Sequence, residues 1–473
     1  MADFWTKSNF SVALETAFGT VNVTDGDYQG LKWRTPKVDL DAETFEFDLM
    51  TGQVGAAPIR ITGARKAKVS ISAPLEAFIT GYAPATDTPG TAACVPPWFA
   101  LAANAIGGNV DAYVAETNAE FWMAKKGIWT QGNKYVVDGV ASATNTSITA
   151  GVAANIWEDA TVDARIGNFV ATYKAAVLST VQAGWIKDYD AATEKVTLFG
   201  ASKNTINDPD AEIAPTITAW LSSAAPRSLS MRHLGEDALA CKQLTGMMPD
   251  SIKWKFTPGQ VGDVEFSFRG YGFEDFPSKG GYAIPPLPLY AANTFETAPK
   301  FTNELSARLM VNGAAQCNWQ DLEIEWVPQI EENVCFGSGI GGVSGLRYVD
   351  QIIKCRFFAP WSDDDTYHID DGAWTATTTA RSQNVWQYRL ESHTTISVVV
   401  EACPSIGKCI SFLMPSLQVV SAKWEQKGKT WGYSIECESS TYSGDAATGV
   451  IQTGTPETAA TSAMNSIFRI GMA

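Results

Sequence analysis

The densest cluster of chemically active side chains in the sequence is acidic. Residues 363–371 contain five aspartates and one histidine, His368. Closely spaced carboxylates suit Ca²⁺, but an EF-hand loop needs ligands at alternate positions and a central glycine, and this order does not fit. We therefore favour a solvated acidic loop between two strands over a metal site.

A glycine-rich run at residues 337–342 matches the G-x-G-x-x-G pattern of dinucleotide-binding proteins. That pattern binds a pyrophosphate only where it follows a strand and opens a helix, so that the helix N-terminus meets the ligand. Here residues 343–345 continue as a loop, and a β pattern follows. The run predicts a flexible loop and not a nucleotide site.

The remaining candidates for chemistry lack partners at suitable spacing. The three histidines, His233, His368 and His393, are scattered, and no H-E-x-x-H or G-x-S-x-G sequence occurs. Cys403 and Cys409 lie six residues apart without two further zinc ligands nearby. Because no set supplies a nucleophile, a base and an orienting group, we expect no enzyme activity, no cofactor and no metal.

Length and composition limit the class of protein. The chain has 473 residues, 45% of them hydrophobic, which predicts more than one folded domain. Its net charge of −16 disfavours tight binding of nucleic acid. No apolar run is long enough for a membrane span, and residues 1–10 lack the pattern of a secretory signal. We expect a protein made in the cytoplasm, with its eight cysteines reduced.

Strand patterns dominate the sequence. Ile252, Trp254 and Phe256 alternate with Lys253 and Lys255, a period of two that places apolar side chains on one face of a sheet and polar ones on the other. The same alternation marks residues 45–49, 66–71, 264–269, 322–326, 353–357 and 431–437. The sequence therefore predicts a mainly β protein whose sheets have one buried face and one solvated face.

One β-rich unit is expected to occur twice. Three segments of the first copy have counterparts in the second, in the same order: residues 31–34 with 324–327, 68–75 with 354–361, and Met248-Pro249 with Met414-Pro415. The middle pair shares a lysine, alternating residues, Ala-Pro and a large apolar residue. A tandem repeat of this kind places two quasi-equivalent subunits in one polypeptide.

The predicted helix and boundaries complete the organisation. Proline at the start and glycine at the end indicate a helix over residues 96–107, and residues 381–394 are its degraded counterpart. The predicted divisions are a first β domain of residues 1–135 and 226–285, a β insertion domain at 136–225, a linker at 286–299 and a second β domain at 300–473.

This order of elements resembles the major tail tube proteins of long-tailed (siphovirus-like) bacteriophages. Those proteins open with an acidic residue before an aromatic-Gly-Thr, as Glu15 precedes Phe18-Gly19-Thr20 here. A strand pair with a long loop, an Ala-Pro step and a short helix ending in glycine follow, then a variable β insertion and a final hairpin. The resemblance covers most of residues 1–275 and, in a shorter form, residues 300–440.

The resemblance implies a structural virion protein. Tail tube proteins have a β-barrel or sandwich core with a flanking helix. They form hexameric rings that stack into a hollow tube around the tape measure protein, and DNA is later ejected through that tube. Two tandem domains imply a trimeric ring with pseudo-sixfold symmetry. The implied partners are further copies of the chain, the tape measure protein, and the tail terminator and baseplate proteins. The implied location is the virion tail, assembled in the bacterial cytoplasm, without a membrane.

Two sets of residues receive roles under this hypothesis. Residues 50–66 and 336–349 are predicted to form loops that contact the neighbouring ring. The contact residues predicted in these loops are Gly52, Val54, Gly55, Gly63, Gly337, Ile340 and Gly345. Carboxylates on polar strand faces are candidates for an acidic lumen that repels DNA phosphates: Glu265, Glu323, Glu325 and Glu436. An outer-surface role in solubility is the alternative for these glutamates.

Other functions stay open. A tail terminator, baseplate hub or decoration protein would be a virion β protein that forms one ring or none. The 16 tryptophans suggest a carbohydrate-binding β protein, whose aromatic side chains would stand exposed. Trp254, Trp326 and Trp424 instead follow the strand alternation, and we expect them to be buried.

Overall fold

The computed structural model describes the β framework of the chain. The residues described are 9–22, 28–31, 36–47, 59–76, 96–107, 128–130, 135–136, 146–149, 167, 169–174, 177–190, 195–200, 202, 204, 206, 211–213, 217–221, 226–234, 240–257, 260–277, 300–301, 307–316, 319–334, 343–360, 385–405, 407–440 and 466–473. The fold is mainly β, with large antiparallel sheets, as predicted. The predicted linker at 286–299 lies outside the described residues.

The first unit contains eight strands and one helix, apart from its insertion. In chain order these are β1 (Asn9–Leu14), β2 (Gln29–Leu31), β3 (Lys37–Phe47), β4 (Ile59–Pro74), α1 (Pro97–Gly107), β13 (Leu229–Leu234), β14 (Ala240–Phe256), β16 (Asp263–Gly270) and β17 (Gly272–Pro277). Helix α1 spans the residues that its proline and glycine signals predict.

The second unit contains the same kinds of element in the same order. They are β19 (Ala307–Val311), β20 (Ala314–Gln316), β21 (Gln320–Val334), β22 (Val343–Pro360), α2 (Val385–Ser392), β23 (Thr395–Ala402), β24 (Ile410–Lys427), β25 (Thr430–Ser439) and β26 (Arg469–Met472). Helix α2 falls within the stretch predicted to be a degraded counterpart of α1. A short pair joins β15 (Gln260–Val261), which lies between β14 and β16, with β18 (Lys300–Phe301), which lies between the two units in sequence.

The strand pairings of the two units match element by element. In the first unit β1 pairs with β2 and β13, β4 with β3 and β16, and β14 with β13, β16 and β17. In the second, β19 pairs with β20 and β23, β22 with β21 and β25, and β24 with β23, β25 and β26. All of these pairs are antiparallel. The two units therefore share one topology.

The irregularities of the two units also match. The β14–β16 ladder is interrupted at Asp250, and the β24–β25 ladder is interrupted at Val420. A second shift occurs at Ser230 in the β13–β14 ladder and at Ser397 in the β23–β24 ladder. A bulge fixes strand register and re-aims the chain beyond it, so shared bulges mean that the units share register as well as strand order.

This register tests the sequence repeat residue by residue. Lys68 in β4 and Lys354 in β22 lie at equivalent positions, because β3 and β21 pair with these strands in the same register. The counterpart of Trp326 in β21 is then Leu40 in β3. The predicted match of residues 31–34 with 324–327 is therefore wrong, since Leu31 ends β2 and pairs with β1.

The Met-Pro match is also out of register. Met414 faces Val398 next to the shared bulge, and its counterpart in the first unit is Leu244, which faces Met231. Met248 lies four residues further along its strand. The two Met-Pro pairs are chance likenesses, because the bulges and not the dipeptides determine which residues correspond.

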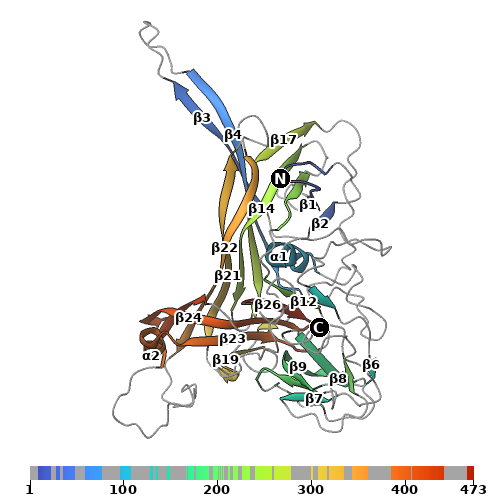
Figure 1. Ribbon diagram of the computed structural model, residues 1–473, viewed down its shortest axis with the longest axis vertical. Coiled ribbons are helices and arrows are strands. Elements are labelled where there is room, and N and C mark those ends of the chain that lie inside the picture. The colour runs from blue at the N-terminus through green and yellow to red at the C-terminus, as the bar shows by residue number, and fades with distance from the viewer. Residues whose placement is uncertain are drawn as a thin grey trace.

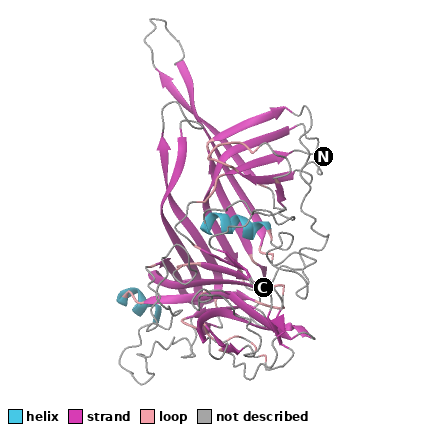
Figure 2. Cartoon of the chain, turned by 45° about the vertical axis from the view of Figure 1, so that its right-hand side comes forward, coloured by secondary structure: helices cyan, strands magenta, loops and turns pink. Residues whose placement is uncertain are grey.

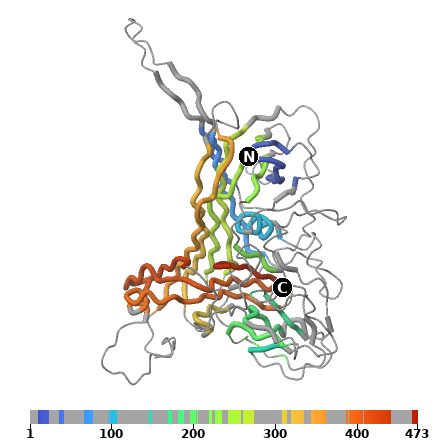
Figure 3. Tube along the Cα trace, in the orientation of Figure 1, coloured from blue at the N-terminus to red at the C-terminus, as the bar shows by residue number. Residues whose placement is uncertain are grey.

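The two units join into one continuous sheet. Strands β14 and β21 pair antiparallel, so the order across the central sheet is β3–β4–β16–β14–β21–β22–β25–β24. Figure 3 shows the orange strands of the second unit running beside the blue and yellow-green strands of the first. Strand alternation gives this sheet one apolar and one polar face.

Both helices pack on apolar side chains of the sheet. Helix α1 contributes its stripe of Trp98, Leu101 and Ile106 to the main hydrophobic core, in which Trp254 and Trp326 are fully buried. In α2, Trp386 packs edge-on against Phe357 of β22, with ring centroids 5.3 Å apart. Figure 2 shows α1 against the strands near the middle of the molecule.

The insertion forms its own sheet and docks on the second unit. Its strands begin before the predicted boundary at residue 136, because β5 pairs with β12 and β6 pairs with β11. They are β5 (Ile128–Thr130), β6 (Tyr135–Val136), β7 (Ser147–Thr149), β8 (Phe169–Lys174), β9 (Val177–Asp190), β10 (Lys195–Leu198), β11 (Ala211–Ile213) and β12 (Ile217–Trp220). Six of them pair in the order β6–β11–β8–β9–β10–β7, whereas β12 pairs with β5 and with β26. Trp185 of β9 donates a 2.8 Å hydrogen bond to Ser411 of β24. The insertion lies at the lower right of Figure 1, next to β23 and β26.

Candidate functional site

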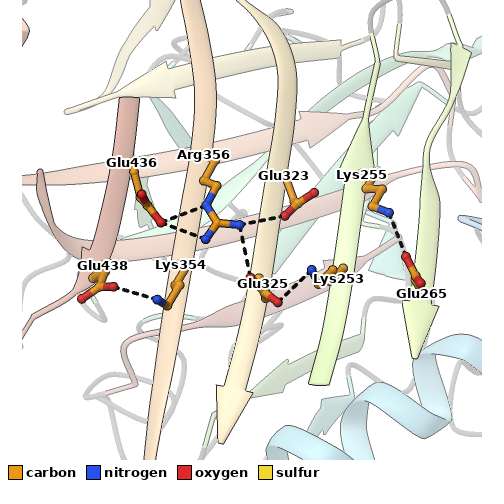
Figure 4. A network of polar contacts seen from close by, with 9 residues as sticks. All are labelled: Lys253, Lys255, Glu265, Glu323, Glu325, Lys354, Arg356, Glu436 and Glu438. Atoms are coloured by element: carbon orange, nitrogen blue, oxygen red, sulfur yellow. Dashed lines mark hydrogen bonds and ion pairs between the residues drawn. The ribbon is translucent and has the colours of Figure 1, made fainter. Parts of the chain in front are cut away.

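The polar face of the central sheet carries a network of ion pairs. Nine charged residues from five adjacent strands meet there, as Figure 4 shows: Lys253, Lys255, Glu265, Glu323, Glu325, Lys354, Arg356, Glu436 and Glu438. Each follows the period-two alternation of its strand, so its side chain points away from the apolar core. The network crosses the boundary between the two units, because β14 belongs to the first and β21 to the second.

Arg356 lies at the centre of this network. Its guanidinium group contacts Glu436 on β25 at 2.8 Å, and Glu323 and Glu325 on β21 at 3.3 and 3.4 Å. The hydrogen bond that Arg356 donates to Glu436 raises the pKa of Arg356, as do the nearby carboxylates, although partial burial opposes them. One guanidinium group therefore links three strands through its planar set of donors.

Three lysines pair with the remaining carboxylates. Lys255 lies 2.8 Å from Glu265, and its hydrogen bond to that carboxylate raises the pKa of the lysine. Lys253 lies 3.1 Å from Glu325 across the junction of the two units. Lys354 and Glu438 form a 2.9 Å pair between β22 and β25. Exposed pairs of this kind contribute roughly 0–1 kcal/mol each to stability, so their main effect is on the charge of the surface.

The network leaves this face nearly neutral. Its four cationic and five carboxylate side chains give a net charge of −1 in a chain whose total is −16. The four glutamates proposed for the lumen do gather on one polar face, as the alternation predicts. Each is paired with a cation, so the face is charge-balanced and not a bare acidic surface.

Most of the predicted inter-ring residues fall outside the described chain. Gly52, Val54, Gly55, Gly337 and Ile340 are among the residues that the structure does not describe. The prediction that Gly63 and Gly345 are loop residues is wrong. Gly63 lies in β4 and Gly345 lies in β22, because each strand begins earlier than the glycine-rich sequence suggests. The two strand pairs, β3–β4 and β21–β22, are topological counterparts, so the two glycine-rich segments connect corresponding strands in the sequence.

The outer half of β24 exposes an aromatic cluster that the sequence did not predict. Trp424 is 47% exposed and Trp431 is 49% exposed, and their rings stack at 5.7 Å with Tyr433 edge-on to Trp424 at 4.9 Å. The expectation that Trp424 is buried is therefore wrong, whereas Trp254 and Trp326 are fully buried as expected. Alternation places Trp424 on the correct face, but it does not tell whether a neighbouring strand covers that face.

Glu15, which carries part of the family resemblance, acts as a buried clamp. Its carboxylate accepts hydrogen bonds from the Gly19 amide at 2.8 Å, and from the Gly246 amide and the Ser230 hydroxyl at 2.9 Å each. Both glycines have positive φ angles, 73° and 61°. The carboxylate thus fixes the turn after β1 against the bend of β14, a structural role.

The described residues contain no candidate metal site. No group of three His, Cys, Asp or Glu side chains within them has the geometry of a metal site. Residues 363–371 and 337–342 lie outside the described chain. Cys403 and Cys409 are free thiols. None of the helices described is long and apolar enough to cross a membrane.

Comparison of the chain with protein-family models and with curated proteins finds no match. Function therefore has to be argued from the fold and its surfaces.

Proposed function

We propose that this chain is a tail tube subunit of a long-tailed bacteriophage, a structural protein whose rings stack into a hollow tube. Three chains, each with two tail-tube-like units, would make a ring with pseudo-sixfold symmetry. The observation that carries the proposal is the repeated topology: two units with the same pairings and bulges lie side by side in one sheet. Continuing that relation from chain to chain extends the sheet and leaves no exposed strand edge in a closed ring.

The charge of the polar face supports a role as the wall of a DNA channel. A strongly cationic wall would hold DNA by its phosphates, whereas the paired charges around Arg356 leave a net charge close to zero. Beyond a Debye length of about 8 Å such pairs exert little field, so DNA would pass without tight binding. The tube would hold the tape measure protein before ejection and would end at tail terminator and baseplate proteins.

Negative-stain microscopy of the purified protein tests this proposal. Uniform hollow tubes, or rings with three equal parts, are expected at high protein concentration. Single rings that never stack would instead favour a terminator, baseplate or decoration protein. Monomers at every concentration would reject the tail tube and would favour a virion protein that forms no ring.

The glycine-rich segments offer a separate test of ring stacking. Residues 50–66 and 336–349 are proposed to contact the next ring. Deleting residues 52–58, which lie between β3 and β4 in the sequence, should leave a folded chain that forms rings but no tubes. Normal tubes from this deletion would reject the inter-ring role.

A second candidate function rests on the aromatic cluster of Trp424, Trp431 and Tyr433. Exposed aromatic rings stack on the apolar faces of sugars, so this surface suits a carbohydrate-binding protein. A glycan array separates the two functions: sugar binding that disappears in Trp431→Ala, in a protein that stays monomeric, would favour the second.

A further inference from the structure

The junction between the two units is a template for a junction between chains. In it, β14 and β21 pair so that Lys253 faces Glu325 and Lys255 faces Glu323. Trp254 lies on the opposite face of the same strand and is fully buried. Backbone pairing, matched charges on the polar face and a covered tryptophan together define this junction.

The two outer strands of the central sheet are the counterparts of these junction strands. β24 corresponds to β14 and β3 corresponds to β21, by their shared pairings and bulges. Within the described chain, residues 420–427 of β24 pair only with β25, and β3 pairs only with β4. Each strand therefore has an edge that no other described strand covers, and such an edge can pair with another chain. One chain presents both halves of the junction, one at each end of its sheet.

The shared register states which residues would meet. We apply the register of the β14–β21 pair to β24 of one copy and β3 of a second copy. Four residue pairs then lie opposite each other: Ala422 with Leu40, Lys423 with Asp39, Trp424 with Val38, and Glu425 with Lys37. The four charged residues of this set are exposed in the single chain. Lys37 and Asp39 pair with each other at 3.1 Å there, an exposed pair that is easily exchanged for new partners.

The charges of this set are complementary, with one reversal. Asp39 and Lys423 repeat the signs of Glu325 and Lys253 in the internal junction. The next pair is reversed on both strands: Glu425 stands where the first unit has Lys255, and Lys37 stands where the second unit has Glu323.

This double reversal keeps the attraction and adds selectivity. Glu425 attracts Lys37 of another copy, whereas pairing of β24 with a β21 strand would set Glu425 against Glu323. Like charges directly opposite each other destabilise a strand pair. The reversal therefore favours chain-to-chain pairing of β24 with β3 over pairing with the internal junction strand.

We propose that β24 of one copy of this chain pairs antiparallel with β3 of a second copy, with Lys423 opposite Asp39. The pairing would cover Trp424 as Trp254 is covered in the internal junction. The partner is thus a second copy of the chain, held by backbone hydrogen bonds and by two ion pairs. Closure into a trimer rests on the proposed function, whereas the strand pairing would hold in any ring or filament of this protein.

Disulfide trapping between two full-length variants tests the register. Asp39→Cys and Lys423→Cys proteins are prepared separately, mixed and oxidised, so that a new covalent dimer can arise only between copies. We expect the mixture to give dimer about tenfold faster than a mixture of Lys37→Cys with Lys423→Cys, because a disulfide needs Cα atoms within about 7 Å. Wild type and each variant alone measure the background from native cysteines, and peptide mapping identifies the bond.

The outcomes separate the pairing from the proposed function. Selective trapping together with hollow tubes supports both. Selective trapping in a protein that forms no tubes supports the pairing and rejects the tail tube. Tubes or rings without trapping at this register overturn the pairing only, and monomers without trapping overturn both.

A charge exchange tests the same register without cysteines. Glu425 and Lys37 suit this test because the residues opposite them on the neighbouring strands of the same chain, Gly432 and Ser70, are uncharged. Lys37 also pairs with Asp39 in the single chain, so Lys37→Glu alone is the matched control. Glu425→Lys should shift assembly to at least tenfold higher protein concentration, and adding Lys37→Glu to the same chain should restore it. Equal assembly of the single and double variants would overturn the pairing.

Discussion

Trp254 and Trp424 occupy the same position in topologically equivalent strands, yet the first is fully buried and the second is 47% exposed. The difference follows from their neighbours. β14 is an inner strand, flanked by β16 and β21, and Phe412 and Phe468 pack on Trp254 with ring centroids 5.7 and 5.2 Å away. The outer half of β24 has β25 on one side alone among the described strands.

The two tryptophans should therefore differ in their effect on the stability of a single chain. Trp254→Ala removes a fully buried ring and should lower the free energy of unfolding by about 3–5 kcal/mol. Trp424→Ala should cost about 1–2 kcal/mol, because half of its surface already contacts water. Urea denaturation of dilute, monomeric protein measures both. Equal losses would mean that Trp424 is covered within the chain.

Removing Arg356 should leave three carboxylates without a shared cation. We expect Arg356→Gln to lower the free energy of unfolding at pH 7 by about 1–2 kcal/mol, a value reduced by solvent screening at this half-exposed site. The loss should shrink as NaCl is added, because salt screens the repulsion among Glu323, Glu325 and Glu436. Thermal unfolding at several salt concentrations measures it.

Lys354→Gln is a matched control for this variant. Lys354 lies two residues earlier on the same strand and face, but it pairs with Glu438 alone among the contacts of the network. Its loss should stay below about 1 kcal/mol and vary less with salt concentration. If the two variants behave alike, Arg356 does not hold the network together.

The buried hydrogen bonds of Glu15 predict that Glu15→Gln lowers the free energy of unfolding more than Arg356→Gln does. Glu15→Gln keeps the size of the side chain but replaces one carboxylate oxygen by an amide group that donates hydrogen bonds. That group would face the amide of Gly19 or of Gly246, both of which already donate. We expect a loss of about 2–4 kcal/mol in urea denaturation, since buried charged hydrogen bonds are costly to remove. The exposed Glu331→Gln should have no measurable effect, and an equal effect would contradict the clamp.

Local sequence patterns predicted the strands and helix α1, whereas strand register depends on pairing between distant segments. The alternation of Ile252, Trp254 and Phe256 placed these residues on a buried face because one periodicity suffices for that. The proline and glycine signals predicted α1 for the same reason. By contrast, Trp326 was matched to the wrong segment, since a shared residue type carries no information about strand register.

The candidate site was predicted only in part. The four glutamates were placed on a polar face, but the pairing of three of them with Arg356 was not predicted, because β21, β22 and β25 are brought together by strand order. The exposure of Trp424 was missed because alternation shows which way a side chain points and not which strand lies beside it. Register and edges are tertiary properties that a single strand does not encode.

The buried thiols of Cys355 and Cys437 predict a loss of stability in alkaline solution. These residues face each other across β22 and β25, and both are fully buried. Burial raises the pKa of Cys437 to about 12 and that of Cys355 well above its ordinary value. A folded-state pKa above the unfolded value means that stability is fully present below the unfolded pKa of about 9 and is lost as the pH rises toward 12.

The double variant Cys355→Ala/Cys437→Ala isolates this contribution. It should be less stable than wild type at pH 7, because it loses buried volume, but its stability should fall less steeply between pH 9 and pH 11. Ile435→Val, a truncation on the same buried face of β25 without a titratable group, controls for packing and should retain the wild-type slope. Urea denaturation at several pH values gives the three slopes. Parallel slopes for all three proteins would show that the thiols stay neutral in the folded and unfolded chain alike.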